Sequence, residues 1–384
     1  MKQLKKIIFL LIPILFSLSC NKDTTEIITP TGANPWESQP KSLLDVSGQI
    51  TDENGNPLAD VQISVGGKTL TTDKLGIFVV SQINENPEHL FVKAEKKGFF
   101  ASSRVIRANV KAKNFIEIHL IAQKEVAKFK SADGANLKLE LMTVKLPKNG
   151  YIDANGKSYS GTVHVAAKYL DPSKTATQNE MPGSLEAAVN KDGKEQVLAT
   201  FGMLACELTD DKGQSLNLDG KAEAEITFPI VNDLQATKPQ EVPLWYFDNK
   251  IGAWREDGMS TRQGNTFVGK VKHFSFWNWD YPYGFVDFEA RFLDADGTPL
   301  TNLYVFISIK KEGIFNFKSG ITDNLGKVSG KIPINEEFVL KFMVKETGQC
   351  IGNNTLTNIT EFKSADIPVK PWRYKICSFT NIFN

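Results

Sequence analysis

The residues best suited to binding chemistry form one dense aromatic stretch between His273 and Tyr283. An exposed aromatic face can stack on a sugar ring, so Trp277, Trp279 and Tyr281 are candidate ligand-binding residues. Strand alternation gives a second interpretation, because it places Trp277 and Trp279 on one face, and large aromatics at a domain junction usually pack domains together. The pattern favours packing and keeps a glycan platform as the alternative.

Motifs for catalysis and for metal binding are absent from the sequence. The four histidines are far apart, and none belongs to a His-Glu-x-x-His zinc motif. There is no Gly-x-Ser-x-Gly nucleophile motif and no glycine-rich phosphate loop. We therefore expect no cofactor, no metal and no enzymatic activity. A hydrolase stays a less favoured hypothesis. Folding can bring together carboxylates that are distant in sequence, such as Glu186, Glu195 and Glu207.

The N-terminal segment has the pattern of a secretory signal. Lys2, Lys5 and Lys6 precede an apolar run of twelve residues, from Ile7 to Leu18. A run of this length is too short to span a bilayer, which needs about 20 apolar residues. Residues 1–19 are therefore predicted to be a signal peptide.

The residues that follow this run resemble the signal of bacterial lipoproteins, with the sequence Leu18-Ser19-Cys20. In that family the cysteine becomes the first residue of the mature protein and carries the lipid, so the resemblance implies lipidation of Cys20 and a membrane anchor. Lys22 and Asp23 resemble the short charged signal that sends some Gram-negative lipoproteins to the outer cell face. We expect an outer-membrane protein at the cell surface, with the periplasmic side as the alternative.

Two further cysteines, Cys350 and Cys377, lie close to the C-terminus. Exported proteins meet an oxidising compartment, so a disulfide between them is one prediction and two buried thiols are the other. Cys206 lies in an apolar segment and is expected to be a buried hydrophobic residue.

Composition restricts the class of protein further. The chain has 384 residues, of which 41% are hydrophobic and 23% charged, close to the average of soluble globular proteins. These values exclude a multi-span membrane protein and a wholly disordered chain. The 45 basic residues nearly balance the 44 acidic ones, so no nucleic-acid partner is expected.

One pattern occurs twice, near both ends of the chain. Residues 52–58 read DENGNPL and residues 294–300 read DADGTPL. Farther along, residues 71–76 read TTDKLG and residues 321–326 read ITDNLG. Each pair of turns encloses an alternating apolar segment typical of a β-strand. The second copy is about eight residues longer, and we place its insertion in a loop at residues 310–317.

Both copies resemble the carboxypeptidase regulatory-like domain, a small transthyretin-like β-sandwich. The resemblance implies a non-catalytic accessory module at residues 45–123 and another at residues 282–384. Residues 20–44 hold the lipidated cysteine and a Thr-, Ser- and Pro-containing tether.

The central region, residues 124–281, is rich in alternating strands and short Gly, Asn and Asp turns. Residues 244–254, LWYFDNKIGAW, read as a hairpin. Together with Asp171-Pro172 and Met181-Pro182-Gly183, this segment resembles the ectodomain of the cartilage intermediate layer protein family, which implies an extracellular structural or binding role.

The sequence thus predicts an all-β fold of tandem β-sandwich domains, transthyretin- or Ig-like, behind a signal peptide and a tether. The favoured function is a non-catalytic, lipid-anchored cell-envelope protein that binds a glycan or a protein partner. The alternative is a structural spacer or accessory subunit of an outer-membrane complex. The oligomeric state stays open.

Overall fold

The computed structural model describes residues 34–172, 174, 176–230, 239–309, 318–344, 350–356 and 363–368. Their regular structure is almost entirely β-strand, with one short helix, α1 (Ala176–Glu180), and one 3-10 turn, η1 (Pro87–His89). The predicted all-β fold class is confirmed. In the described ranges, no helix has the length and apolar character needed to cross a membrane.

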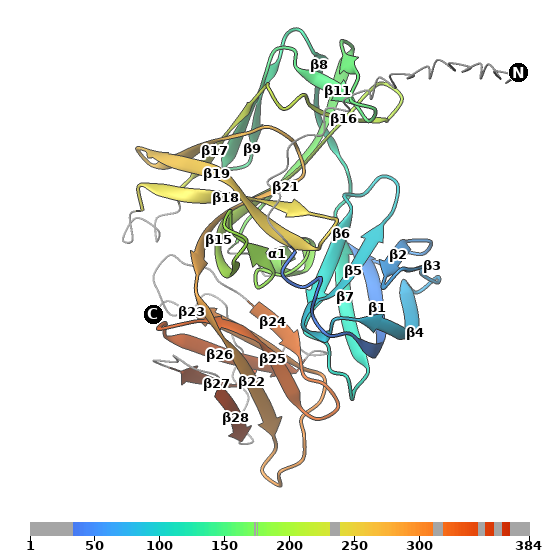
Figure 1. Ribbon diagram of the computed structural model, residues 1–384, viewed down its shortest axis with the longest axis vertical. Coiled ribbons are helices and arrows are strands. Elements are labelled where there is room, and N and C mark those ends of the chain that lie inside the picture. The colour runs from blue at the N-terminus through green and yellow to red at the C-terminus, as the bar shows by residue number, and fades with distance from the viewer. Residues whose placement is uncertain are drawn as a thin grey trace, which may run out of the picture.

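The first group of strands forms a sandwich of two sheets, here called the first sandwich (Figure 1). One sheet has the order β4-β1-β7 and consists of β1 (Ser42–Asp52), β4 (Ile77–Glu85) and β7 (Asn114–Leu120). The other has the order β3-β2-β5-β6 and consists of β2 (Gln62–Val65), β3 (Lys68–Thr71), β5 (Leu90–Glu95) and β6 (Ser102–Ile106). In β1, Val46 and Ile50 are buried and the residues beside them less so, which is the period of a strand with one face in a core.

The last group of strands, here the second sandwich, repeats this architecture. Its sheets have the orders β25-β22-β28 and β24-β23-β26-β27. The first consists of β22 (Phe285–Leu293), β25 (Lys327–Pro333) and β28 (Lys363–Pro368). The second consists of β23 (Leu303–Ile309), β24 (Lys318–Ile321), β26 (Phe338–Val344) and β27 (Cys350–Leu356). In both sandwiches the first strand pairs antiparallel with the fourth and parallel with the seventh. The insertion predicted at residues 310–317 lies outside the described residues.

The repeated turns have the same hydrogen bonds in both copies. The Thr72 hydroxyl donates to the Leu58 carbonyl, and the Thr322 hydroxyl donates to the Leu300 carbonyl, each at 2.7 Å. Each threonine precedes an Asp-x-x-Gly turn whose aspartate accepts from two backbone N–H groups. The repeated sequence therefore forms the same hydrogen-bonded turn in both copies, and this turn joins the two sheets of each sandwich.

Gly76 closes this turn in the first sandwich, and we expect Gly76→Ala to destabilise the protein by about 2–4 kcal/mol. Its φ is +71°, and a Cβ atom there would lie 2.3 Å from the Ile50 carbonyl oxygen, so strain and a clash add together. Gly55, at φ +83°, has nothing within 4 Å of an added Cβ. Gly55→Ala is therefore the control, with a cost of about 1 kcal/mol from backbone strain alone. An equal loss of stability for Gly76→Ala and Gly55→Ala in urea unfolding would contradict the clash.

The chain between the two sandwiches forms a 14-stranded sheet, here the central sheet. Its main path has the order β12-β11-β16-β15-β21-β18-β19-β20-β17-β10-β9, and β13, β8 and β14 branch from it. The strands on one half are β11 (Tyr151–Asp153), β12 (Ser158–Tyr159), β13 (Thr162–Leu170), β14 (Ala188–Val189), β15 (Glu195–Thr209), β16 (Ser215–Leu218) and β8 (Glu125–Lys130). The others are β9 (Ala135–Leu139), β10 (Met142–Leu146), β17 (Ala224–Pro229), β18 (Glu241–Asp248), β19 (Ala253–Gln263), β20 (Thr266–Val271) and β21 (Phe276–Tyr283).

The hairpin predicted in this region is present, because β18 and β19 pair antiparallel with Phe247 opposite Trp254.

Buried aromatic side chains fix the first sandwich to the central sheet. Phe100, 1% exposed, enters an apolar cluster of the central sheet and meets Phe276 edge to face, with ring centroids 6.1 Å apart. Trp36 stacks on His89 at 3.9 Å and packs against Ala187. These contacts fix the first sandwich to the central sheet beside α1, which packs against β7 (Figure 1).

Candidate functional site

The aromatic stretch of β21 is part of the hydrophobic core. Trp277 and Trp279 are both 0% exposed. Trp279 stacks on Phe228 with ring centroids 5.2 Å apart, and the Trp277 indole N–H donates to the His273 carbonyl at 3.0 Å. Neither indole presents a face to a ligand, so the prediction that these two residues form a glycan-binding platform is wrong. The physical reason is that burying such large rings removes much apolar surface from water.

Tyr281 is the member of this stretch whose ring is exposed. It is 44% exposed and meets Tyr283 edge to face at 5.1 Å. A role of Tyr281 in ligand binding stays a prediction.

The cysteine predictions fall mostly outside the described structure. Cys20 and Cys377 lie outside the described residues, and Cys350 is placed by its backbone in β27 alone. Lipidation and the disulfide therefore stay predictions. Cys206 is a buried free thiol, and burial raises its pKa far above that of an exposed cysteine.

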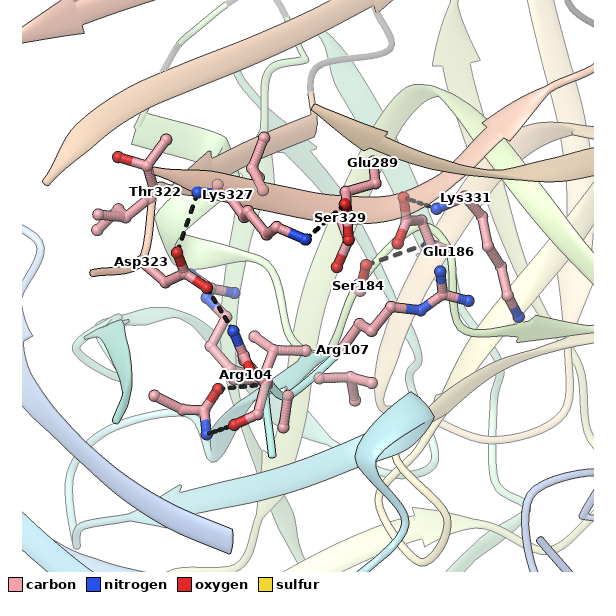
Figure 2. A pocket seen from close by; sticks show the side chains of 18 of the residues that line it. Arg104, Arg107, Ser184, Glu186, Glu289, Thr322, Asp323, Lys327, Ser329 and Lys331 are labelled. Carbon is pink, nitrogen blue, oxygen red and sulfur yellow. Dashed lines mark hydrogen bonds and ion pairs between the residues drawn. The ribbon is translucent and has the colours of Figure 1, made fainter. Parts of the chain in front are cut away.

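A cavity of about 1000 Å³, here the junction cavity, lies where the two sandwiches and the central sheet meet (Figure 2). The first sandwich contributes the segment from β6 to β7, including Arg107, Asn109 and Phe115. The central sheet contributes α1 and the segment after it, and the second sandwich contributes residues of β22 and β25 together with residues of β23, β24 and β26. All three parts of the chain thus supply one site.

Several charged side chains of the junction cavity are paired within the protein (Figure 2). Arg107 contacts Glu88 at 2.5 Å and Asp287 at 2.7 Å, so it links the two sandwiches. Asn109 donates to Asp323 across the same boundary at 2.5 Å. These contacts hold the walls of the cavity at fixed positions.

Two lysines of β25 complete this set of pairs. Lys327 contacts Glu289 at 2.8 Å, and Lys331 contacts Glu195 of the central sheet. The Lys331 backbone N–H also donates to Glu186 at 2.8 Å. The charges of the lining therefore largely compensate one another, and apolar side chains such as Val105, Ile307 and Phe338 also line the cavity.

Arg104 fastens α1 to the first sandwich at the edge of the cavity. Its guanidinium donates to the carbonyls of Asn179 and Met181, both at 2.6 Å, and its Nε–H donates to the Glu117 carbonyl at 3.0 Å. Burial lowers the pKa of Arg104 to about 10, so the guanidinium stays charged at neutral pH. Nearby, the Tyr304 hydroxyl of the second sandwich donates to the Glu117 carboxylate at 2.6 Å.

The carboxyl groups with the most perturbed pKa values do not line the cavity. Burial raises the pKa of Asp280 well above its usual range, and Asp280 lies in the core beside Asn278. Burial raises the pKa of Glu207 to about 7, and this side chain accepts a hydrogen bond from Gln123 in the segment between β7 and β8. In the described ranges no group of three His, Cys, Asp or Glu side chains could hold a metal ion. Of the carboxylates that keep a hydrolase as a hypothesis, Glu186 lines the cavity and Glu195 contacts Lys331 at its wall, whereas Glu207 is not part of the lining.

Glu207 makes the stability of the protein fall as the pH rises. Its pKa in the folded protein, about 7, exceeds the ordinary value of 4.5, so folding favours the protonated acid. This contribution is complete below pH 4.5 and is lost between pH 4.5 and 7. We expect Glu207→Gln to remove that loss and to be about 2–3 kcal/mol more stable than the wild type at pH 8.

Urea unfolding at pH 4 and pH 8 measures this difference, with Glu241→Gln on the exposed face of β18 as the control. A wild-type stability that stays constant between those two pH values would contradict the raised pKa.

Sequence reasoning missed two residues of the cavity, Phe115 and Gln178. Phe115 interrupts the polar side of β7 in the segment Asn114 to Ile118, and an aromatic residue among polar ones was a readable signal. Gln178 lies on α1, a five-residue helix between strands that no periodicity marks.

No family model matches the chain. The chain is similar to cartilage intermediate layer protein 2 of Homo sapiens, with 26% identity over 127 residues. This segment covers 32% of the chain and only 10% of that protein's length.

Among solved structures, the chain is similar to the major pilin subunit BcpA of Bacillus cereus, with 10% identity and a TM-score of 0.19 over 86% of this chain and 100% of that one. The major pilin SpaD of Corynebacterium diphtheriae gives 10% identity and a TM-score of 0.19 over 86% and 98%. TM-scores this low do not establish a common fold over the whole chain.

Proposed function

We propose that this chain is a non-catalytic, lipid-anchored protein of the cell envelope that binds a partner in the junction cavity. The observation that carries the proposal is the cavity itself, about 1000 Å³ in volume and lined by both sandwiches and the central sheet. Its size is typical of sites for small ligands or short polymer segments. The ion pairs Arg107–Asp287 and Lys331–Glu195 are interdomain contacts that set the shape of a binding site.

The anchor and the location are part of the same proposal. Cys20, after the signal-like residues 1–19, would carry the lipid, and Lys22 and Asp23 would direct the protein to the outer cell face. The duplicated sandwich, with equal strand order and equal turn hydrogen bonds, supports the assignment of both copies to the carboxypeptidase regulatory-like class. This class supplies accessory modules, and the partner would be a glycan or another envelope protein.

Protease treatment of intact cells tests the location. We expect the wild-type protein to be degraded on intact cells, and a Cys20→Ala variant to be lost from the membrane fraction. Protection in intact cells, with degradation after lysis, would contradict surface exposure and place the protein on the periplasmic side.

A photoreactive amino acid tests binding in the cavity. Val110 lines the cavity and is 50% exposed, whereas Leu141, 57% exposed, lies in the β9–β10 turn outside it. We expect an adduct from position 110 on intact cells, identified by mass spectrometry, and none from position 141. Equal labelling at the two positions would contradict a binding role of the cavity.

A structural spacer is the second candidate, and one observation favours it. Arg107, Asn109 and Tyr304 join the two sandwiches directly, so the three parts form a connected unit that could transmit load. A spacer predicts that cavity variants leave every association unchanged, whereas a binding protein predicts loss of its partner.

A further inference from the structure

Three polar side chains form a cluster inside the apolar core, between β15 and β21. Thr200 is 1% exposed, and Asn278 and Asp280 are both 0% exposed. Thr200 interrupts the otherwise apolar run of β15 from Val197 to Leu204. Burying polar groups in such a core is costly unless they interact with one another.

An irregularity in β15 brings the Thr200 side chain to this cluster. The two strands pair side by side, with Thr200 opposite Asp280 and Met203 opposite Asn278, so β15 has one residue more than β21 between these pairs (Figure 1). Gly202, inside this bulge, has a φ of +139°, a conformation that favours glycine. Bulges re-aim side chains, and this one directs the Thr200 hydroxyl at the Asn278 amide.

The three groups contact one another directly. The Thr200 hydroxyl donates to Oδ1 of Asn278 at 2.8 Å, and the Asn278 amide nitrogen donates to the Asp280 carboxyl group. The same carboxyl group also interacts with the Thr200 hydroxyl. Burial raises the pKa of Asp280 well above its usual range, which favours the neutral acid, a group that can both donate and accept a proton. A hydroxyl, a carboxamide and a carboxylic acid thus meet where water is excluded.

We propose that these residues form an intramolecular ester bond that links Thr200 of β15 to Asn278 of β21. The Thr200 Oγ1 forms a bond with the Asn278 Cγ, the Cγ–Nδ2 bond breaks, and the nitrogen leaves as ammonia. Asp280 accepts the hydroxyl proton on one carboxyl oxygen and gives its own proton to the leaving nitrogen from the other, so the acid is regenerated. Atoms and charge balance without any oxidant, reductant or co-reactant.

The surroundings of the cluster favour this reaction. The strands hold the hydroxyl and the amide in contact, and fixed proximity of two reacting groups lowers the barrier of a slow reaction. An ester has no O–H or N–H donor, so it costs less to bury than the two groups that it replaces. The step takes place once in each molecule and needs no bound partner, so it is independent of the function proposed above.

Peptide mass spectrometry tests the bond on the full-length protein, denatured and digested with a protease. We expect one linked pair of peptides, one containing Thr200 and the other Asn278, whose mass is the sum of the two less one ammonia molecule. Hydroxylamine at alkaline pH cleaves esters and is expected to separate the pair into two peptides.

Four variants assign the roles of the residues, and circular dichroism confirms that each is folded. Thr200→Val keeps the shape of the side chain without its hydroxyl and is expected to abolish the linked pair. Asp280→Asn keeps both reacting groups and is expected to lower the yield of the pair at least about tenfold. Thr200→Ser retains a hydroxyl, and Thr209→Val changes a threonine at the far end of β15, so both are expected to keep the link.

A competing reaction of Asn278 gives a different result. Its side chain can lose ammonia by closing a succinimide ring with its own backbone, and that loss of mass appears within a single linear peptide. A succinimide of this kind, or linear peptides of full mass from the wild-type protein, overturns the inference. A linked pair that persists in Thr200→Val also overturns it, because the bond then involves another residue.

Discussion

Trp279→Ala is expected to destabilise the protein by about 3–5 kcal/mol, the range for deleting a large buried aromatic ring. Trp279 is 0% exposed and stacks on Phe228, so its removal opens a cavity that the surrounding strands cannot close. Trp277→Ala is expected to cost a similar amount, because Trp277 is equally buried and its indole N–H has a partner. Chemical denaturation with two spectroscopic probes measures both changes.

Tyr281→Ala is the control on the same strand, and we expect it to cost less than about 1 kcal/mol because its ring is 44% exposed. Trp279→Phe serves if the alanine variant does not fold. It keeps most of the apolar volume and removes an indole N–H that has no hydrogen-bond partner among the described residues, so its cost is expected to be below about 1.5 kcal/mol. An unchanged unfolding midpoint for Trp279→Ala would refute the buried core and restore the exposed platform.

Arg104→Met is the second large effect, an expected loss of about 3–4 kcal/mol. The methionine keeps the apolar stem of the side chain but removes all of its hydrogen bonds. The carbonyls of Glu117, Asn179 and Met181 would then lose their donor at a partly buried boundary. Because those carbonyls belong to β7 and to the α1 region, the contact between the first sandwich and α1 is expected to open before the rest of the protein unfolds.

Hydrogen exchange around α1, combined with urea unfolding, measures this prediction. Arg291→Met is the matched control, because among the described residues the Arg291 guanidinium makes a single hydrogen bond, of 3.3 Å, to the Leu325 carbonyl. Arg104→Lys is expected to lose nearly as much stability as Arg104→Met. An ammonium group lacks the planar fork of the guanidinium and cannot donate to several separate carbonyls at once. Unchanged exchange at α1 in Arg104→Met would show that the guanidinium does not fasten this boundary.

Local patterns determined much of the fold. The alternation of apolar and polar residues in segments such as Val46 to Ile50 predicted the strands. The repeated Asp-x-x-Gly turns at Gly76 and Gly326 identified a duplicated unit. Both signals act over a few residues, because a strand face has a period of two and a glycine at positive φ marks a turn by itself. The duplication of the sandwich could therefore be predicted from the sequence without knowing which surfaces of the folded domains contact each other.

Only the tertiary structure decided where the site lies. The sequence pointed to Trp277 and Trp279, because aromatic density is visible along the chain. Their burial depends on packing against strands far away in sequence, such as β15 and β17. Phe115 and Gln178 come from distant segments and share a wall because α1 packs on β7. Alternation states which residues share a face of a strand. Whether that face meets the core, another module or a cavity is set by long-range packing, on which a local pattern carries no information.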